Sequence, residues 1–399
     1  MPNVAELSFL DKDLGQRWDA VREDFWGDLK SETVRAVKRL LETSMEVEVQ
    51  DLLGRPRWGH SMSQTGYRNG YYRRSLLTGF GRITDLSVPR LRSGGLRFKT
   101  IGRYRRRTKD VDAAVQEVFL AGVSTRRIQE AMAPLFGERE MSATTVSSIT
   151  KSLNVQVQAY HHRPIADVYR YIFLDGIYLK AKSPVHSRRR CVLVAYGIRS
   201  DGVRELIDFK LARNGESQAA WECFLTNLRN RGFRGAQAEL AVLDGNVGLW
   251  NAVDMVWPHL RCQLCWAHKL RNVANHLPKR LQKPCMSQAR EIYAAESRGL
   301  AVRAFQRWER IWKPIAPEAV RCLNRDMEDL LPFYDCPCEL WVKLRTTNAI
   351  ERIFREVRRR TRPMSCFTNI GSVERITYAI FSRMNRIWRE KPLKITQNS

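Results

Sequence analysis

Hydrophobic positions follow a helical period at the start of the chain and a strand-like alternation later. In residues 1–50 apolar side chains recur every three to four positions, at Val34, Val37, Leu41 and Met45. This spacing places them on one face of a helix. We therefore expect residues 1–50 to be a helical N-terminal segment.

Short strands and then short helices are expected between residues 51 and 160. Ile83 to Arg90 alternates apolar and polar residues, and Asn69-Gly70 is a favoured turn pair. Residues 111–160 contain three short helical stretches, and the last begins after Ser142, a residue type that caps helices. Their spacing is that of a helix-turn-helix, although a helical hairpin that binds nothing has the same pattern.

Apolar runs beyond residue 165 predict an α/β sheet domain over residues 165–271. Residues 272–341 are helical in pattern and rich in tryptophan, which indicates an all-helical insertion, and residues 342–399 supply the final helices of the domain. The expected strands are Tyr169–Leu174, Cys191–Ile198, Leu206–Leu211, Glu239–Leu243 and His259–Leu264, with a helix at Ser217–Arg229.

The charge of the chain favours a polyanionic partner. Its 68 Lys and Arg exceed its 42 Asp and Glu and leave a net charge of +26. Cations placed on phosphates release condensed counterions, so nucleic acid is the expected partner. The excess gathers in residues 51–110, where 15 basic and 3 acidic residues are interleaved with aromatic side chains. This pattern indicates a small basic DNA-binding β module rather than a solvated surface.

Particular side chains in this N-terminal half are candidates for DNA contacts. The last helix of the helix-turn-helix carries small polar groups and a lysine, which suit base edges or phosphates in a major groove. The candidates are Arg68, Arg73, Arg74, Arg105, Arg106 and Arg107 in the basic module, and Thr144, Thr145, Ser148 and Lys151 in that helix.

A membrane is not the expected partner. No run of about 18 apolar residues occurs, and the first residues lack the pattern of a signal peptide. The nine cysteines are an odd number and none falls in the first 190 residues, which fits reduced thiols better than a disulfide framework. We therefore expect a cytoplasmic protein.

Two aspartates carry the candidate chemistry. Asp175 and Asp244 each follow an apolar run and precede a glycine, so each carboxylate is expected at the end of a strand. An Asp that merely caps a turn is the alternative for each, but two such strand ends in one sheet favour a shared site. Carboxylates suit Mg²⁺ or Mn²⁺, and phosphodiester cleavage uses two such ions about 4 Å apart. A third carboxylate on a neighbouring helix is therefore expected.

Several motifs resemble the Mutator-type transposases of bacterial insertion sequences, and the resemblance covers most of the chain. They are Phe-Leu-Asp175-Gly-Ile-Tyr-Leu-Lys, Leu-Asp244-Gly-Asn, Cys265-Trp-Ala-His268-Lys-Leu-Arg-Asn and Thr347-Asn-Ala-Ile-Glu351-Arg, with Gly66-Tyr-Arg-Asn-Gly, Val88-Pro-Arg and Gly122-Val-Ser-Thr-Arg nearer the N-terminus. The resemblance implies a ribonuclease H-like catalytic domain with a helical insertion. It also implies a catalytic triad, called DDE, of Asp175, Asp244 and Glu351 that binds two Mg²⁺ or Mn²⁺ ions.

Helical spacing distinguishes Glu351 from Glu356, which follows it on the same expected helix. Glu351 borders the apolar stripe, whereas Glu356 lies about 140° further round at about 100° per residue and is expected to pair with Arg352 or Arg360. Glu351 belongs to a polar stripe whose arginines are expected to follow the DNA backbone, namely Arg355, Arg358 and Arg362.

The Cys265-x-x-His268 signature leaves two interpretations. We expect both side chains to pack and hydrogen-bond behind the carboxylates and to shape the site. The alternative is a zinc site that includes Cys262 and takes a fourth ligand from Cys285, Cys336 or Cys338. Paired ligands at the closed spacing of structural zinc sites are not seen, which disfavours zinc.

The expected function is that of a DNA transposase. The N-terminal half is expected to bind the terminal inverted repeats of an insertion sequence, and the catalytic domain to cut those ends and join them to target DNA. Two ends must be held together, so a homodimer or larger assembly is expected. A DNA-binding regulator without catalysis and a nuclease without strand transfer are the alternatives.

Overall fold

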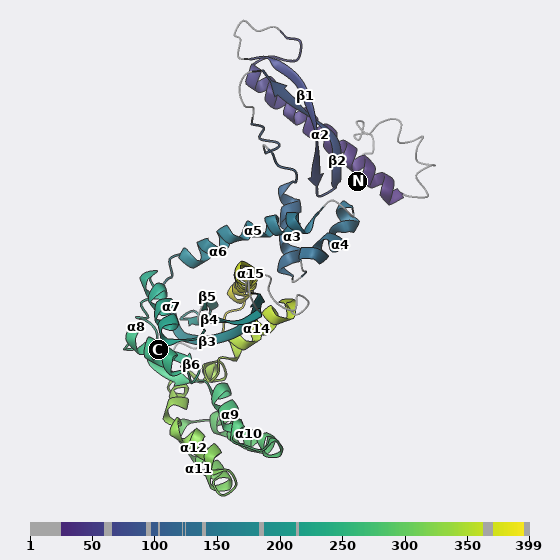
Figure 1. Cartoon of the computed structure of the whole chain (residues 1–399). Coiled ribbons are helices and arrows are strands. Elements are labelled where there is room, and N and C mark those ends of the chain that lie inside the picture. Colours follow the sequence, from purple (N-terminus) through teal and green to yellow (C-terminus); the bar gives the residue numbers. More distant parts are fainter. Residues whose placement is uncertain are drawn as a thin grey trace, which may run out of the picture. The chain divides into compact units, whose positions relative to one another are not determined.

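The computed structural model describes residues 25–394, apart from 60–65, 93–96, 103, 122, 124, 138–140, 183–186, 213–214 and 362–369. The chain forms two compact units, residues 1–151 and 152–399 (Figure 1). The boundary between them lies inside the segment 111–160. In the part of the chain that the structure describes, no helix is both long and apolar enough to cross a membrane.

The N-terminal unit begins with a long helix that packs on a hairpin. Helix α2 (Phe25–Leu53) contacts the antiparallel strands β1 (Arg68–Thr78) and β2 (Gly81–Leu91). Met45 of the helix shares a core with Leu76, Leu86 and Val88 of the hairpin. The helical segment and the start of the basic module, which the sequence pattern separates near residue 50, therefore share one core.

The expected turn at Asn69-Gly70 is wrong. Both residues lie within β1, where the register shifts between Arg68 and Tyr71 and Gly70 has φ +67°. A glycine in this left-handed conformation is typical of a β-bulge, which uses the same residue type as a tight turn. The chain reverses instead at Gly79-Phe80, since Thr78 pairs with Gly81.

Three helices complete this unit: α3 (Lys109–Leu120), α4 (Thr125–Phe136) and α5 (Ala143–Lys151). They bury Phe119, Met132 and Val146, and each contacts the other two. Ser142 caps α5, because its Oγ accepts a hydrogen bond of 3.1 Å from the backbone N–H of Thr145.

A mixed five-stranded sheet is the centre of the second unit, in the order β5-β4-β3-β6-β7. Strand β3 pairs antiparallel with β4 and parallel with β6, and β7 extends the parallel side. The strands are β3 (Tyr169–Lys182), β4 (Ser187–Arg199), β5 (Arg204–Ala212), β6 (Leu240–Leu243) and β7 (Arg261–Leu264). The expected strands are thus present, with different ends.

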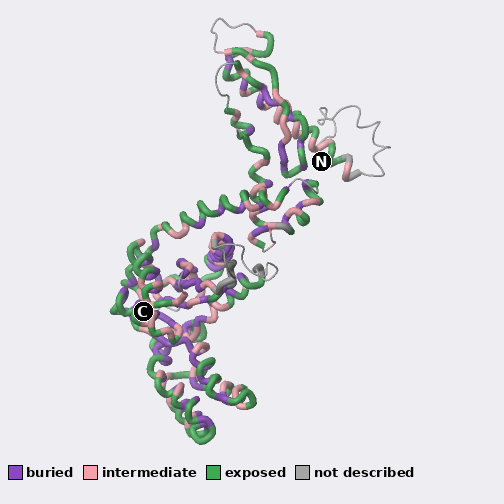
Figure 2. Tube along the Cα trace, viewed as in Figure 1, coloured by how far each residue is buried: buried purple, intermediate pink, exposed green. Residues whose placement is uncertain are grey.

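Helices cover both faces of this sheet (Figures 1 and 2). Alternate strand residues such as Ile172 and Leu174 share a core with α7 (Gln218–Asn230) and α8 (Val247–Val256). The opposite face contacts α14 (Asn348–Thr361) and α15 (Ile370–Arg389), and Phe209 of β5 lies 5.1 Å from Phe381 of α15 between ring centroids. Helix α6 (Leu153–His162) packs against α15 and β5.

A helical segment separates β7 from α14. It consists of α9 (Trp266–Asn275), α10 (Lys279–Ala294), α11 (Arg298–Trp312), α12 (Pro317–Arg325), three short 3₁₀ turns and α13 (Trp341–Leu344). Hydrogen bonds from buried indole N–H groups to backbone carbonyls connect parts of this segment with one another. Trp266 Nε1 donates to the Leu330 carbonyl, and Trp308 Nε1 donates to the Cys285 carbonyl. The chain thus leaves the sheet after β7 and returns to it at α14.

Candidate active site

Asp175 lies inside β3 and not at its end, so the expected position is wrong. The pairing of β3 with β6 ends at Phe173 opposite Val242, whereas its pairing with β4 continues to Lys182. Beyond the carboxylate, Ile177 and Leu179 are again buried, so the apolar alternation resumes after one polar residue. Asp175 is therefore in the stretch of β3 that runs past the end of β6.

Burial and neighbouring carboxylates disfavour a charge on Asp175. The residue is only 2% exposed, and its Oδ2 has no hydrogen-bond partner among the described residues. Burial raises the pKa of Asp175 to about 7, and the charges of Asp244 and Glu351 add to this rise, while His268 and Thr347 oppose it. A buried carboxylate of this kind favours a cation beside it.

Asp244 directly follows β6, as expected. Its Oδ1 accepts a hydrogen bond of 3.1 Å from the backbone N–H of Asn246. The cap of α8 is Asn246, whose Oδ1 accepts from the backbone N–H of Leu249, so Asp244 is not the residue that caps this helix. Burial raises the pKa of Asp244 above its ordinary value, and the Asn246 hydrogen bond and His268 oppose the rise.

Glu351 lies in the first turn of α14 and faces α9. Its Oε1 accepts a hydrogen bond of 2.9 Å from Arg271 and lies 3.8 Å from His268 Nε2. Glu356 is engaged elsewhere, because it pairs with Arg359 at 2.8 Å. Glu356 thus has a partner three residues further on, and the side chain of Arg360, one of its two expected partners, lies outside the described residues.

Cys265 and His268 connect the start of α9 to the start of α14. The Sγ atom of Cys265 accepts hydrogen bonds from the backbone N–H and the hydroxyl of Thr347, at 3.2 and 3.4 Å. The Thr347 hydroxyl also lies 3.5 Å from His268 Nδ1. Thr347 immediately precedes α14, so this network fixes where the helix that carries Glu351 begins.

The Cys265 and His268 pair is also an electrostatic unit. Burial raises the pKa of the Cys265 thiol, but the hydrogen bond and charge of His268 outweigh it and leave the pKa lowered. Burial lowers the pKa of His268, yet Cys265 and Asp175 outweigh it and raise that pKa to about 9. An imidazolium at this position lies close to the carboxylates and partly balances their charge.

The donor set of the site fits hard divalent cations. Carboxylate oxygens are the ligands that Mg²⁺ and Mn²⁺ prefer, and Asp175 presents an unpartnered buried oxygen. Among the described residues, however, no three His, Cys, Asp or Glu side chains already surround one point as metal ligands. Of the three carboxylates, Glu351 is held by a cationic side chain, because its Oε1 accepts a hydrogen bond from Arg271.

The cysteines that the zinc interpretation requires lie in different elements of the structure. Cys262 lies in β7 and its Sγ contacts the Leu260 carbonyl at 3.6 Å, whereas Cys265 is engaged with Thr347. Cys285 is buried on α10, and Cys336 and Cys338 lie among the 3₁₀ turns.

A further carboxylate, Glu216, stands at this site and was missed from the sequence. A Cβ built on Gly176 would lie only 2.6 Å from the Glu216 carboxyl carbon, so this carboxylate rests on β3 over Gly176, on the face of the strand opposite to the one from which Asp175 projects. Trp221 Nε1 donates a hydrogen bond to it at 3.1 Å. Burial raises its pKa, and the charge of Asp244 adds to the rise. The only signal in the sequence was Gly176, whose missing side chain leaves room for it.

The candidate DNA contacts in the N-terminal unit differ in whether they are already paired within the protein. Arg68 and Arg107 pair with Glu46 and Asp112, at 2.7 and 2.9 Å, so their charges are already compensated. Arg73, Arg105 and Arg106 are exposed and Arg74 is half-buried.

On α5, Thr144, Ser148 and Lys151 are exposed at positions i, i+4 and i+7 and share one face, whereas Thr145 is half-buried against the Ser142 hydroxyl. Arg355 and Arg358 are exposed on α14, and Arg362 lies outside the described residues.

Comparison with known proteins identifies relatives along almost the whole chain. The family described as "Transposase, Mutator family" matches residues 16–391. The chain is 31% identical to the transposase for insertion sequence element ISRM5 of Rhizobium meliloti (strain 1021), over 89% of this chain and 88% of that protein. It is 30% identical to the transposase for insertion sequence element IS256 in transposon Tn4001 of Staphylococcus aureus, over 90% and 95% respectively.

One solved structure, the Drosophila P element transposase strand transfer complex, aligns with 70% of this chain and 79% of its own at 12% identity. Its TM-score of 0.29 is too low to establish a shared fold. The sequence relatives are decisive, because the family match and both transposases extend over nearly the full length. The chain belongs to the Mutator family of transposases.

Proposed function

We propose that this transposase is a DDE enzyme that cuts the ends of its insertion sequence and joins them to target DNA. Asp175, Asp244 and Glu351 are its metal-binding carboxylates. Residues 165–271 and 342–399 form a ribonuclease H-like catalytic domain, and residues 272–341 are a helical insertion within it. The supporting observation is the buried, unpartnered oxygen of Asp175, a carboxyl group whose pKa is raised by burial and further by the charges of Asp244 and Glu351.

The reaction has two steps, and in each an oxygen nucleophile attacks the phosphorus of a phosphodiester. Water attacks the phosphodiester at the end of the element, the bond from phosphorus to the 3′ oxygen of the element breaks, and a 3′-hydroxyl is released while the flanking strand keeps the phosphate. This 3′-hydroxyl then attacks a phosphodiester of the target DNA, forms a new phosphodiester and releases the 3′-hydroxyl of the cut target strand. Two bound Mg²⁺ or Mn²⁺ ions supply activation of the attacking oxygen and stabilisation of the leaving oxygen. No side chain of the protein becomes covalently attached to DNA in this scheme.

The residues around the carboxylates hold them in place. The Cys265 and His268 network to Thr347 fixes the start of α14 and so orients Glu351 towards β3. His268 and Arg271 balance part of the negative charge, and Arg271 holds Glu351 through its 2.9 Å hydrogen bond. In this proposal they position the third carboxylate and do not take part in bond breaking.

The N-terminal unit binds the terminal inverted repeats in this proposal. Arg73, Arg74, Arg105 and Arg106 contact phosphates, and the exposed face of α5 with Thr144, Ser148 and Lys151 enters a major groove. Two ends must be held at once, so the active assembly is at least a homodimer.

A cleavage and joining assay tests this function. The purified protein is incubated with labelled element ends and plasmid DNA, with and without Mg²⁺. We expect metal-dependent nicking at the element end followed by labelled plasmid. Nicking without labelled plasmid would identify a nuclease, and binding without either product would identify a regulator; both results reject the proposal.

A further inference from the structure

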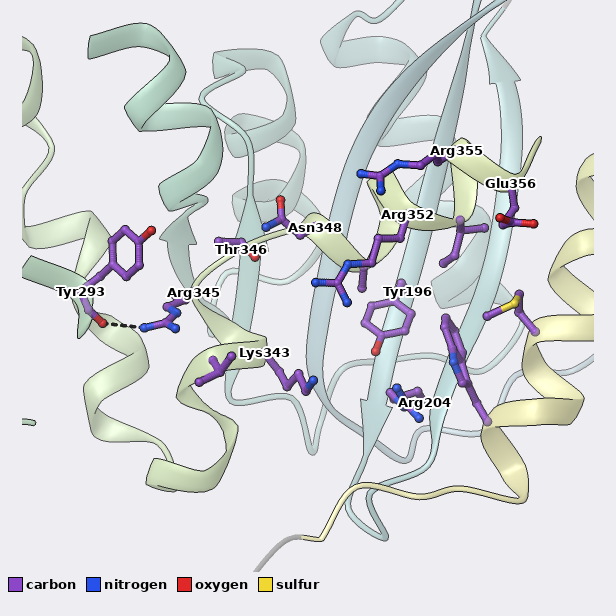
Figure 3. A pocket seen from close by; sticks show the side chains of 15 residues that line it. Tyr196, Arg204, Tyr293, Lys343, Arg345, Thr346, Asn348, Arg352, Arg355 and Glu356 are labelled. Carbon is purple, nitrogen blue, oxygen red and sulfur yellow. Dashed lines mark hydrogen bonds between the residues drawn. The ribbon is translucent and has the colours of Figure 1, made fainter. Parts of the chain in front are cut away.

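A basic pocket lies beside the face of α14 next to Glu351 (Figure 3). It is about 580 Å³ in volume and is formed between α14, the segment that precedes it, strands β4 and β5, and α15. Five cations and one carboxylate occur among the described residues that line it. The cations are Arg204, Lys343, Arg345, Arg352 and Arg355, and the carboxylate is Glu356.

Two of these cations are fixed by contacts with neutral groups. Arg345 donates a hydrogen bond of 2.9 Å to the Tyr293 carbonyl and stacks over its ring at 4.8 Å. Arg204 donates to the Lys391 carbonyl and lies over the ring of Trp388 at 5.2 Å. These contacts hold the guanidinium groups in place without neutralising them.

The other three cations reach into the opening from its rim. Lys343, Arg352 and Arg355 are exposed, and the structure gives none of them a carboxylate partner within the described residues. The Glu356 carboxylate pairs with Arg359, which does not line the pocket. Figure 3 shows Lys343 and Arg352 directed to the same side of the opening from two different segments. Like charges gathered in this way repel one another unless an anion lies between them.

The pocket is adjacent to the proposed active site. Asn348, Arg352 and Arg355 line the pocket at positions i, i+4 and i+7 of α14. Glu351 lies three residues after Asn348 and four before Arg355, so it is their neighbour on the helix surface. A helix rises about 1.5 Å per residue, so Glu351 and Arg355 are roughly 6 Å apart along its axis. The charges of one DNA strand repeat about every 3.4 Å along its axis, so this distance corresponds to about two nucleotides.

The walls of the pocket favour a phosphate backbone over a base. Tyr196 and Trp388 are 3% and 8% exposed, so their ring faces are not available for stacking. The exposed groups are guanidinium and ammonium donors, together with half-buried Thr346 and Asn348. Such donors bind phosphate oxygens without reading sequence.

We propose that this pocket binds the phosphodiester backbone of the DNA strand immediately next to the bond that is cut. The proposal rests on the proposed function, because the active site defines which bond that is. Lys343, Arg352 and Arg355 contact consecutive phosphates, and Arg204 and Arg345 form the fixed base of the pocket. The strand is thereby held against α14 with its scissile phosphate at Glu351.

The test compares two triple variants of the full-length protein. Lys343→Gln, Arg352→Gln and Arg355→Gln remove three charges from the pocket. Arg303→Gln, Arg307→Gln and Arg310→Gln remove three exposed charges from α11 as a matched control. Affinity for an element-end duplex with flanking DNA is measured over a salt series in EDTA, and phosphate ethylation interference locates the contacts.

The pocket variant should lower the slope of log affinity against log salt by about 0.9 for each lost phosphate, so by roughly 2 to 3. Interference next to the cleavage position should disappear in this variant, with no change in the control. An unchanged slope and interference pattern, or equal changes in both variants, would overturn the proposal. If the triple variant does not fold, Lys343→Gln and Arg355→Gln singly carry the same test, each with a slope change of about 1.

Failure of this proposal is separable from failure of the proposed function. The binding measurements contain no divalent metal and require no cleavage. A wild-type protein that cuts and joins DNA but shows no pocket-dependent contacts rejects the pocket alone. A protein with these contacts that never cuts rejects the proposed function alone.

Discussion

Replacing Asp175 by asparagine should stabilise the fold in the absence of divalent metal. The side chain keeps its size but loses a charge that is buried, unpartnered at Oδ2 and close to two other carboxylates. Catalytic carboxylates placed together in this way lower the stability of the protein that carries them. The variant should therefore be more stable and inactive.

The magnitude follows from the raised pKa of Asp175. Its pKa rises from an ordinary 3.8 to about 7 on folding. Stability is then full below about pH 3.8 and declines as the pH rises towards 7, because the unfolded chain releases its proton first. A shift of about three units corresponds to about 4 kcal/mol. Relaxation of the site reduces this, so Asp175→Asn should gain about 2 to 4 kcal/mol at pH 8 and little at pH 4.

Thermal melting in EDTA at several pH values measures this effect. Eight of the eleven tryptophans lie between residues 152 and 399, so their fluorescence reports mainly on the second unit. The gain at pH 8 corresponds to a rise in Tm of roughly 5 to 15 °C. The wild-type protein should lose stability as the pH rises from about 4 to about 7, and Asp175→Asn should lose less.

Asp208 supplies a matched control, because it is equally buried at 2% exposure but paired with Arg231 and with His161 at 2.7 Å. Asp208→Asn leaves the half-buried Arg231 without its carboxylate and should destabilise by about 3 to 5 kcal/mol. A loss of stability in Asp175→Asn similar to that in Asp208→Asn would show that Asp175 has a structural role. The reasoning would then be refuted.

Three further outcomes are expected. Glu351→Gln should abolish cleavage and strand transfer in the joining assay. Glu356→Gln weakens a surface pair with Arg359 worth about 0.2 to 0.5 kcal/mol and should retain most activity; equal losses would mean that the wrong glutamate has been assigned. Cys265→Ala should lower the free energy of unfolding by about 1 to 3 kcal/mol in denaturant melts, because the buried backbone N–H of Thr347 loses its acceptor. Stoichiometric zinc in the wild-type protein that is missing from this variant would contradict this explanation. Glu216→Gln should weaken Mn²⁺ binding about tenfold by calorimetry, or about 1.4 kcal/mol. Glu222→Gln, in helix α7 that begins two residues after Glu216, should not weaken it, and equal affinities of the two variants would exclude Glu216 from the site.

The order of strands and helices could be predicted from the sequence because burial imposes a period on each element. The ends of elements could not. The apolar run pauses at Asp175, so a pattern based on hydrophobicity ends the strand there, yet pairing with β4 continues to Lys182. Likewise Asn69-Gly70 suits both a turn and a bulge, and only the register with β2 distinguishes them. Long-range pairing decides both cases, and a local pattern does not contain it.

The candidate site, too, could be predicted from the sequence only in part. Asp175 and Asp244 are recognisable in the sequence as carboxylates that follow apolar runs and precede a glycine. Glu351 is identified through a motif that resembles a family, since its separation in sequence from the two aspartates says nothing about its distance in space. Glu216 has no such motif and enters the site only because β3 and the start of α7 come together at Gly176. The choice of Arg359 as the partner of Glu356 depends on side-chain rotamers that helical spacing alone leaves open.

Iron-mediated cleavage of the polypeptide tests the central claim most directly. Fe²⁺ that replaces Mg²⁺ at a protein site generates hydroxyl radicals with ascorbate and peroxide, and these cut the backbone near the ligands. The account predicts cuts near residues 175, 244 and 351 that excess Mg²⁺ suppresses and that Asp244→Asn removes. Cuts confined to the region around Cys262 and Cys285, or none near the three carboxylates, would contradict it.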